Sequence, residues 1–194
     1  MNHVIGIDEA GRGPLAGPVS VGAVKVSTHF NKKFFKGIRD SKQLSEVDRE
    51  LWFGLLKEAK KKGQADFAVT LISEKTIDKH GIAYAIRQGI KRCLEKVEGH
   101  PNDQVFLDGG IKAPIEFIHQ KTVIKGDEKI PVISLASIAA KVTRDRYMKT
   151  LGKKHPEYGF EVHKGYGTLM HRQKIRTYGP SDAHRRSFLK KLTN

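Results

Sequence analysis

The stretch that most limits how this chain can fold is VIGIDEAGRGP, which runs from Val4 to Pro14. Its first four residues are apolar apart from Gly6, and this pattern predicts a short buried strand. Asp8 and Glu9 stand where that strand is expected to end, and neighbouring side chains on a strand point to opposite faces. The two acids therefore cannot both be ordinary solvated charges beside an apolar core.

A glycine-bracketed arginine, Gly11-Arg12-Gly13, follows the two acids, and Pro14 prevents the strand from continuing. Acids at a strand end, followed by glycines that expose the backbone, suit a site that binds a cation and admits a phosphate backbone. The alternative is an acidic turn followed by a Gly-Pro loop, because turns are rich in Asp and Gly.

The charge of the whole chain favours a polyanionic partner. The net charge is +15 and the isoelectric point is near 9.9. Residues 141–194 hold 14 Lys and Arg against 4 Asp and Glu, a difference of +10. A basic surface around a few acids is typical of a metal-dependent enzyme that acts on nucleic acid. Charge alone also fits a non-catalytic RNA- or DNA-binding protein.

The sequence shows no sign of a membrane or secretory location. No apolar run approaches the roughly 20 residues that cross a bilayer, and residues 1–3 lead directly into the first expected strand. The single cysteine, Cys93, excludes an intramolecular disulfide and a cysteine zinc site, and is expected to pack as a small apolar residue. We expect a cytoplasmic protein with no membrane partner. A monomer is the default, because no strand edge or apolar stripe stands out as an interface.

Strand and helix patterns alternate along the chain, which indicates an α/β domain with a mixed sheet. Strands are expected at 4–7, 18–26, 65–72, 104–107 and 115–124. Helices are expected at 45–62, at 73–94 with a break near Gly81, from about 132 onward, and at 168–177 and 181–192. The segment 29–37 fits either a short edge strand or a loop. We expect residues 1–150 to form the core and residues 151–194 to form a basic helical region packed on it, within one domain.

Two of the expected helices carry apolar residues at helical spacing. In the helix at 45–62 these are Leu51, Leu55 and Ala59. In the long helix after 132, the expected core residues are Leu135, Ala139 and Val142. Its other face is polar and is expected to lie at the surface; it holds Ser134, Ser137, Lys141, Arg144 and Asp145.

Acidic side chains follow three of the expected strands. Asp8, Glu9 and Asp108 end two strands and Asp127 follows a third, so the four carboxylates converge if these strands are neighbours. Mg²⁺ and Mn²⁺ prefer oxygen ligands of this kind. Two such ions about 3.5–4 Å apart can activate a water and stabilise the leaving oxygen in phosphodiester hydrolysis. The nine histidines are scattered and resemble no zinc site, and no Walker-type phosphate loop is present.

Taken together, these motifs resemble ribonuclease HII, the prokaryotic type 2 ribonuclease H. The matching stretches cover nearly the whole chain in family order: GIDEAGRGPLAGPV (6–19), DSKQLS (40–45), FLDGG (106–110), KGD (125–127), SLASIAAKVTRD (134–145), HKGYGT (163–168) and YGPSDAHRRSF (178–188). The resemblance implies a ribonuclease H-like mixed five-stranded sheet flanked by helices, with a C-terminal helical region.

The resemblance also implies an activity. It is that of an endonuclease which hydrolyses the RNA strand of RNA/DNA hybrids and cuts 5′ to ribonucleotides embedded in duplex DNA. Cleavage would use two metal ions, Mn²⁺ or Mg²⁺, and leave 3′-hydroxyl and 5′-phosphate ends. The implied metal-binding and catalytic residues are Asp8, Glu9, Asp108 and Asp127.

The resemblance assigns substrate-binding roles as well. Gly11, Arg12 and Gly13 match the element that reads the ribose 2′-hydroxyl through backbone groups, and Tyr166 matches the tyrosine that stacks on the sugar at an RNA–DNA junction. Asp145 is given a structural or phosphate-orienting role. Positions expected near the phosphate backbone are Ser41, Lys42, Ser137 and Lys141.

Two other kinds of nuclease share some of these features. Ribonuclease HIII carries an extra N-terminal domain and a glutamate four residues after the third acid, whereas here three residues precede the first strand and that position is Lys112. A resolvase- or transposase-like nuclease also uses clustered acids. The Gly-Arg-Gly element and Tyr166 favour reading a ribose over reading branched DNA.

Overall fold

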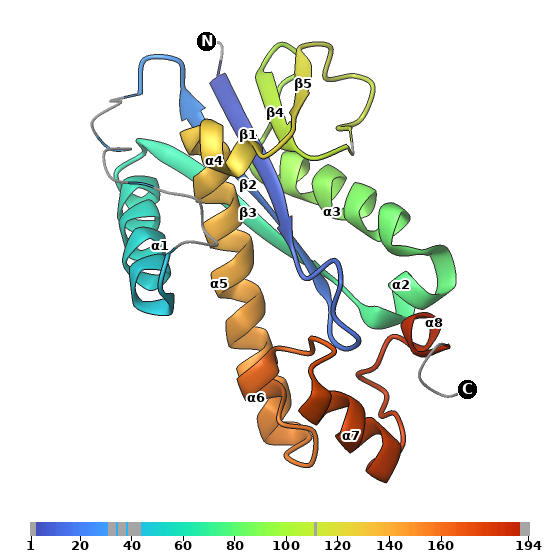
Figure 1. Ribbon diagram of the computed structural model, residues 1–194. Coiled ribbons are helices and arrows are strands. Elements are labelled where there is room, and N and C mark those ends of the chain that lie inside the picture. The colour runs from blue at the N-terminus through green and yellow to red at the C-terminus, as the bar shows by residue number, and fades with distance from the viewer. Residues whose placement is uncertain (1–2, 31–33, 35–37, 39–43, 111, 191–194) are drawn as a thin grey trace.

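Five strands form one mixed sheet in the order β3-β2-β1-β4-β5 (Figure 1). The computed structural model describes residues 3–30, 34, 38, 44–110 and 112–190. The strands are β1 (His3–Ala10), β2 (Val19–Ser27), β3 (Ala65–Ile72), β4 (Gln104–Asp108) and β5 (Gln120–Val123). β1 pairs antiparallel with β2 and β2 with β3, whereas β4 runs parallel to β1 and β5 parallel to β4. The expected mixed five-stranded sheet is confirmed.

Helices cover both faces of this sheet (Figure 1). α3 packs on one face, and α1 and α5 pack on the other. The helices of the chain are α1 (Glu46–Lys61), α2 (Glu74–His80), α3 (Ile82–Lys96), α4 (Gly126–Lys129), α5 (Pro131–Lys154), α6 (Phe160–His163), α7 (Leu169–Tyr178) and α8 (Arg186–Leu189) within the described residues. The helix expected at 73–94 is divided at Gly81, as predicted. Within the described residues, none of the helices has the length and apolar character that crossing a membrane requires.

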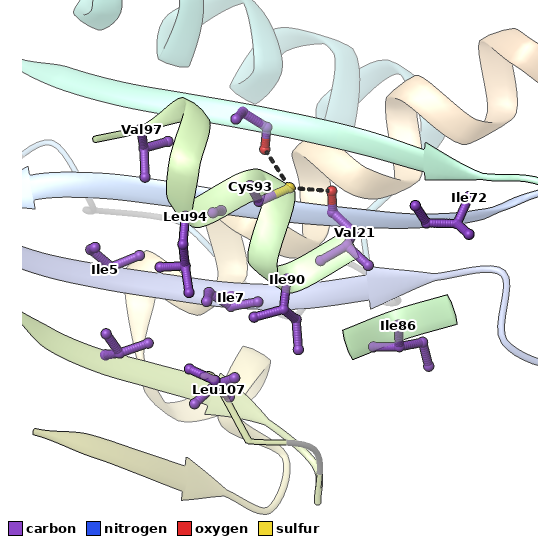
Figure 2. Close-up of a cluster of buried hydrophobic side chains, with 14 of the residues drawn as sticks. Ile5, Ile7, Val21, Ile72, Ile86, Ile90, Cys93, Leu94, Val97 and Leu107 are labelled. Carbon is purple, nitrogen blue, oxygen red and sulfur yellow. Dashed lines mark hydrogen bonds between the residues drawn. The ribbon is translucent and has the colours of Figure 1, made fainter. Parts of the chain in front are cut away.

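The face covered by α3 holds an apolar core (Figure 2). Ile5 and Ile7 of β1 contribute to it from the centre of the sheet, and Leu94 contributes from α3. Cys93 is also buried there, and its Sγ donates to the carbonyl of Val21 at 3.2 Å. The cysteine therefore packs as a small buried residue, as expected.

The opposite face is covered by α5, which lies directly on β1 and β2. A Cβ atom at Gly6 would lie 2.4 Å from the Val132 carbonyl carbon, and one at Gly22 would lie 2.4 Å from the Ala136 oxygen. Only residues without side chains permit so close an approach. The helix backbone therefore packs directly on the sheet, and Ser137, the residue after Ala136, comes to lie beside Asp8.

This close packing overturns the prediction that the polar face of the long helix is a surface. Four of its five residues are buried and Lys141 is partly buried; the buried residues are Ser134, Ser137, Arg144 and Asp145. The expected apolar residues Leu135, Ala139 and Val142 are buried too. The helix is thus enclosed on both sides, because strands, α1 and the C-terminal region surround it.

Three further predictions need correction. On α1 the buried side chains are Phe53, Leu56 and Ala59, while Leu51 is 63% exposed, because Phe53 packs edge-on against Phe67 of β3 and sets the inward face. The strand expected at 115–124 is shortened to β5, because a turn closes 114–117. In the described part of the helix expected at 181–192, only α8 is helical.

The C-terminal region packs on the core through a small apolar cluster. It joins α5 and the opening loop to residues after 155, and consists of Ala16, Met148, Leu151, Tyr158, Phe160 and Ala183. We keep the division after residue 150 as a proposal; α5 runs through it without a break.

The parts of segment 29–37 that are described, among them Phe30 and Phe34, pack against the α5 side of the sheet, and the rest of it lies outside the described residues.

Candidate active site

Three carboxylates from separate elements meet at one edge of the sheet. Asp8 stands near the end of β1, Asp108 ends the adjacent parallel strand β4, and Asp127 lies in α4, just after β5. One carboxylate oxygen from each lies within 4.8 Å of the others. The predicted convergence is therefore correct for these three acids.

The carboxylate of Asp8 has a raised pKa. It is buried beneath α5 and accepts hydrogen bonds from the Ser137 hydroxyl and, at 2.7 Å, from the Glu9 backbone N–H. Burial raises its pKa well above the ordinary value, and the nearby charges of Glu9 and Asp108 raise it further, against the lowering effect of Ser137. A charged Asp8 is therefore costly unless a cation sits nearby.

The other two acids are fixed by the turn that enters α4. The Gly126 N–H donates to Asp108 Oδ1 at 2.8 Å, and a Cβ at Gly126 would lie 2.7 Å from the Ile133 Cδ1 atom. Asp127 is 1% exposed, and its backbone carbonyl accepts a hydrogen bond from the Ser134 hydroxyl on α5. The local backbone thus holds the carboxylates of Asp108 and Asp127 close to that of Asp8.

The donor set fits a hard divalent cation. Closely spaced carboxylate oxygens, without sulfur or imidazole among them, are the ligands that Mg²⁺ and Mn²⁺ select. Glu9 lies outside the three-acid group and accepts a hydrogen bond from Arg12 Nη1 at 3.3 Å. Strand alternation explains this, because Asp8 faces α5 and the next residue points the other way.

The loop after β1 is held in shape by two buried arginines. Arg185 donates to the carbonyls of Gly11 at 2.7 Å, Arg12 at 3.0 Å and Gly17 at 2.8 Å. Arg144 donates to the carbonyls of three further residues, which are Ala16, Pro18 and Lys164. Burial lowers the pKa of Arg185 to about 9, and the neighbouring Arg144 charge contributes.

Gly11 needs to be glycine for two reasons. Its φ is +85°, and a Cβ there would lie 2.0 Å from the Arg144 Nε atom. A Cβ on Gly13, by contrast, would meet no described atom within 4 Å. The arginines therefore bind the inner side of the loop, and its outer side at Gly13 stays open.

A cleft of 540 Å³ joins this loop to the carboxylates. Its lining contains Asp8, Glu9, Ala10, Gly11, Arg12, Gly13, Arg49, Asp108, Ser137, Lys141 and Tyr166. Most predicted substrate-binding residues therefore share one cleft with Asp8, Glu9 and Asp108, whereas Asp127 is not part of its lining. Ser41 and Lys42 lie outside the described residues.

Tyr166 forms the far wall of the cleft and is 43% exposed. Its ring lies beside two cations, with Lys141 Nζ at 5.9 Å and Arg144 Cζ at 5.8 Å from the ring centroid. Lys141 Nζ also donates to Asp145 Oδ1 at 2.9 Å. Asp145 thus orients Lys141, which agrees with the structural role expected for it.

Sequence reasoning missed several residues of this region. Arg49 enters the cleft from α1, and Arg185 supports the loop from 174 positions away. The local sequence of Arg185, HRRSF, shows two arginines between a histidine and a serine, and this pattern does not predict that one of the arginines is buried. The histidines are also not all scattered, because His163, His171 and His184 form one buried cluster behind Tyr166.

The comparisons with known proteins identify the family. A family model described as Ribonuclease HII matches residues 5–191. The chain belongs to the ribonuclease HII family. Membership makes it a ribonuclease H enzyme, of a type that acts on RNA/DNA substrates and depends on a divalent metal.

Similar proteins cover almost the whole chain. A Ribonuclease HII from Bacillus cytotoxicus is 43% identical over 188 residues, which are 97% of this chain and 69% of the relative. One from Caldicellulosiruptor bescii is 43% identical over 190 residues, which are 97% of this chain and 87% of the relative. The sequence resemblance to ribonuclease HII, rather than HIII, is confirmed.

Solved structures share the fold. The ribonuclease H2 of Pyrococcus horikoshii has a TM-score of 0.76 at 27% identity, with 98% of this chain and 96% of that chain covered. The match to the PCNA:RNase HII complex from Archaeoglobus fulgidus has a TM-score of 0.77 at 24% identity, with 94% and 93% covered. The ribonuclease HII chain thus has the ribonuclease H-like fold that its motifs predict.

Proposed function

We propose that this ribonuclease HII hydrolyses the RNA strand of RNA/DNA hybrids and cuts 5′ to single ribonucleotides embedded in duplex DNA. Cleavage leaves a 3′-hydroxyl and a 5′-phosphate. The observation that carries the proposal is the cleft in which Asp8 and Asp108 of the three-acid group, the Gly11–Gly13 loop and Tyr166 lie together.

The acids provide the cation site of this proposal. Asp8, Asp108 and Asp127 would bind the divalent ions, and Glu9, at the mouth of the same cleft, is the proposed fourth ligand. Bound Mg²⁺ or Mn²⁺ would supply the charge that activates a water and stabilises the leaving oxygen. The Ser137 hydroxyl orients Asp8 for this role by donating a hydrogen bond to it.

Selectivity for RNA has to come from residues other than the acids, because metal ions hydrolyse any positioned phosphodiester. The 2′-hydroxyl distinguishes RNA from DNA, and it both donates and accepts hydrogen bonds. The loop Gly11–Gly13 begins three residues after Asp8, and its backbone at Gly13 is open to the cleft. A ribose bound to this backbone would lie beside the acids.

Tyr166 reads the neighbouring sugar in this proposal. Its exposed ring lies in the same cleft, where it can pack against a deoxyribose that lacks the 2′-oxygen. Arg12, Arg49 and Lys141 supply positive charge along the cleft for the phosphates. Ser41 and Lys42 stay predicted phosphate contacts.

One assay separates this function from the alternatives. The protein is mixed with Mg²⁺ or Mn²⁺ and with a labelled RNA/DNA hybrid, a DNA duplex, a DNA duplex with one ribonucleotide, and a four-way DNA junction. Cleavage of the hybrid and of the single-ribonucleotide duplex alone is expected. Cleavage of the four-way junction would favour a resolvase-like nuclease, and binding without cleavage would favour a passive nucleic-acid binder.

Three further expectations stay predictions. They are a monomeric protein, a cytoplasmic location and the identity of the divalent metal as Mn²⁺ or Mg²⁺. The same assay, run with each metal in turn, measures the last of these.

A further inference from the structure

A cluster of buried histidine rings lies behind Tyr166 and is not part of the lining of the cleft. His171 of α7 and His184, just before α8, are 0% and 1% exposed. Their Nε2 atoms lie 3.1 Å apart. The His163 ring stacks on His171 with centroids 4.2 Å apart.

The hydrogen bonds determine which nitrogen of each ring carries a proton. The Tyr166 carbonyl only accepts, so His171 Nδ1–H donates to it at 2.9 Å. A neutral His171 then has a bare Nε2, which accepts from His184 Nε2–H. His184 Nδ1 is left bare and accepts the Ser181 backbone N–H at 3.0 Å. The pair therefore forms one directed chain of donors that ends on Tyr166.

Both ends of this chain attach to the loops that line the cleft. At one end, His171 binds the backbone of Tyr166. At the other end, the His184 backbone forms a β-bridge with Ala16, and the next residue, Arg185, binds the Leu15 carbonyl at 2.8 Å. The Leu15 N–H in turn donates to Gly165 at 2.8 Å. The two histidines therefore close a ring of contacts between the opening loop and the Tyr166 loop.

This arrangement works only while both imidazoles are neutral, because a proton on His171 would set two N–H groups against each other. Burial lowers the pKa of His171 to about 4, with a contribution from His163. Burial lowers the pKa of His184 to about 4 as well, with contributions from His171, Arg186 and His155. The charged and titratable side chains that face the pair are thus histidines and an arginine. Because their positive charges repel an added proton, they favour the neutral state of both rings.

We propose that His171 and His184 are positioning residues that set the distance between Tyr166 and the Gly11–Gly13 loop, and so set the preference for RNA–DNA junctions. The inference rests on the proposed function of Tyr166 as a reader of the sugar. The histidines do not touch the substrate; they act through the backbone of residue 166.

The test compares two substrates in one protein. The ratio of kcat/KM for a single-ribonucleotide duplex to kcat/KM for a continuous hybrid is measured, because changes at the shared metal site cancel in it. Four variants are compared with the wild type: Tyr166→Ala, His184→Phe, His184→Gln and Phe160→Leu. Phe160 packs against both rings at 5.5 Å without joining the hydrogen-bonded chain, so Phe160→Leu is the packing control.

The expected pattern is specific. Tyr166→Ala lowers the ratio, and His184→Phe lowers it about fivefold, the loss expected when one hydrogen bond that positions a group is removed. His184→Gln keeps an N–H near the position of Nε2 and recovers most of the ratio. Phe160→Leu lowers the melting temperature and leaves the ratio unchanged.

Two other patterns overturn the inference in distinguishable ways. If Tyr166→Ala lowers the ratio while His184→Phe lowers only the melting temperature, the histidines are structural and the proposed reading by Tyr166 stands. If Tyr166→Ala leaves the ratio unchanged, that reading fails and the inference fails with it.

A spectroscopic measurement on the wild type does not depend on any variant folding. Nitrogen NMR of the imidazoles is expected to show a proton on His171 Nδ1 and on His184 Nε2, with neither ring titrating until pH is near 4. The opposite tautomers, or titration near 6.5, would contradict the directed chain.

Discussion

Arg185 Nη2 donates to the carbonyl of Gly11 at 2.7 Å, across 174 positions of the chain. The same guanidinium binds the carbonyls of Arg12 and Gly17. One side chain from the C-terminal region therefore holds the loop in which the Gly-Arg-Gly element stands. The C-terminal region is thus part of the site as well as a basic surface.

Arg185→Lys is expected to destabilise the protein and impair cleavage. Lysine keeps the charge but loses the planar fork, so some of the three carbonyls lose their donor. Each buried group left without a partner costs about 1–3 kcal/mol in the free energy of unfolding. Urea unfolding and cleavage of a single-ribonucleotide duplex measure the two effects. Arg186→Lys, at the exposed neighbour, is the matched control, and an equal loss there would argue against a specific role for Arg185.

Asp8→Asn is expected to abolish cleavage and to stabilise the metal-free protein. Burial and neighbouring acids raise the pKa of Asp8, so its charge opposes folding at neutral pH and the opposition is relieved as pH falls. Removing the charge should raise the melting temperature by about 2–4 °C for each kcal/mol of repulsion removed. Mn²⁺ should raise the melting temperature of the wild type more than that of Asp8→Asn. Wild-type cleavage by the variant would show that the acids do not form the metal site.

Asp108→Asn is expected to abolish cleavage as well, whereas Asp127→Asn should leave residual activity, because we expect Asp127, which does not line the cleft, to bind only the outer of the two metals. Both variants are expected to fold and to bind hybrid. Gel-shift and cleavage assays on the same preparations measure this, and loss of binding together with cleavage would point to misfolding.

Mild acid is expected to destabilise the folded protein through His171 and His184. Their pKa values fall from 6.5 to about 4 on folding, so the unfolded chain binds protons that the folded protein excludes. The free energy of unfolding therefore decreases as pH falls from 6.5 to 4, by about 3 kcal/mol for one histidine. The measurement is urea unfolding at several pH values in this range. A variant with both histidines replaced by Phe should lose less stability; an equal loss would contradict the assignment.

Affinity for the hybrid is expected to fall steeply with salt, because Lys and Arg release counterions from phosphates. Replacing the exposed Arg172 and Arg176 of α7 with Gln should reduce the slope of log affinity against log salt by about 0.9 for each lost phosphate contact. Lys91→Gln, on α3 across the sheet, is the control and should leave the slope unchanged. A salt-independent affinity would exclude the C-terminal region as a nucleic-acid surface.

The local patterns of the sequence predict much of this fold. Short apolar runs locate β1 to β4, and Ser45 at the expected helix start caps α1, where it forms a capping box with Asp48. Acids at strand ends predict the group Asp8, Asp108 and Asp127, because neighbouring parallel strands bring their ends together.

Long-range packing accounts for what the patterns miss. The polar face of α5 is buried because Gly6 and Gly22 let the helix contact the sheet. The sequence of α5 itself does not predict this burial, because both glycines lie in other elements. His171 lies in α7, and His184 and Arg185 lie in the loop before α8. Their burial follows from partners outside their own elements, which for Arg185 lie up to 174 positions away. A strand as short as β5 and a helix as short as α8 depend on their surroundings more than on propensity.

The central claim is that the open backbone of Gly11–Gly13 reads a 2′-hydroxyl beside the three acids. The most direct measurement compares cleavage of a DNA duplex with one ribonucleotide, the same duplex with 2′-O-methyl at that position, and an all-DNA control. Cutting of the first alone, on the 5′ side of the ribonucleotide, is the predicted result. Equal cutting of the methylated duplex or of the all-DNA control would contradict the claim.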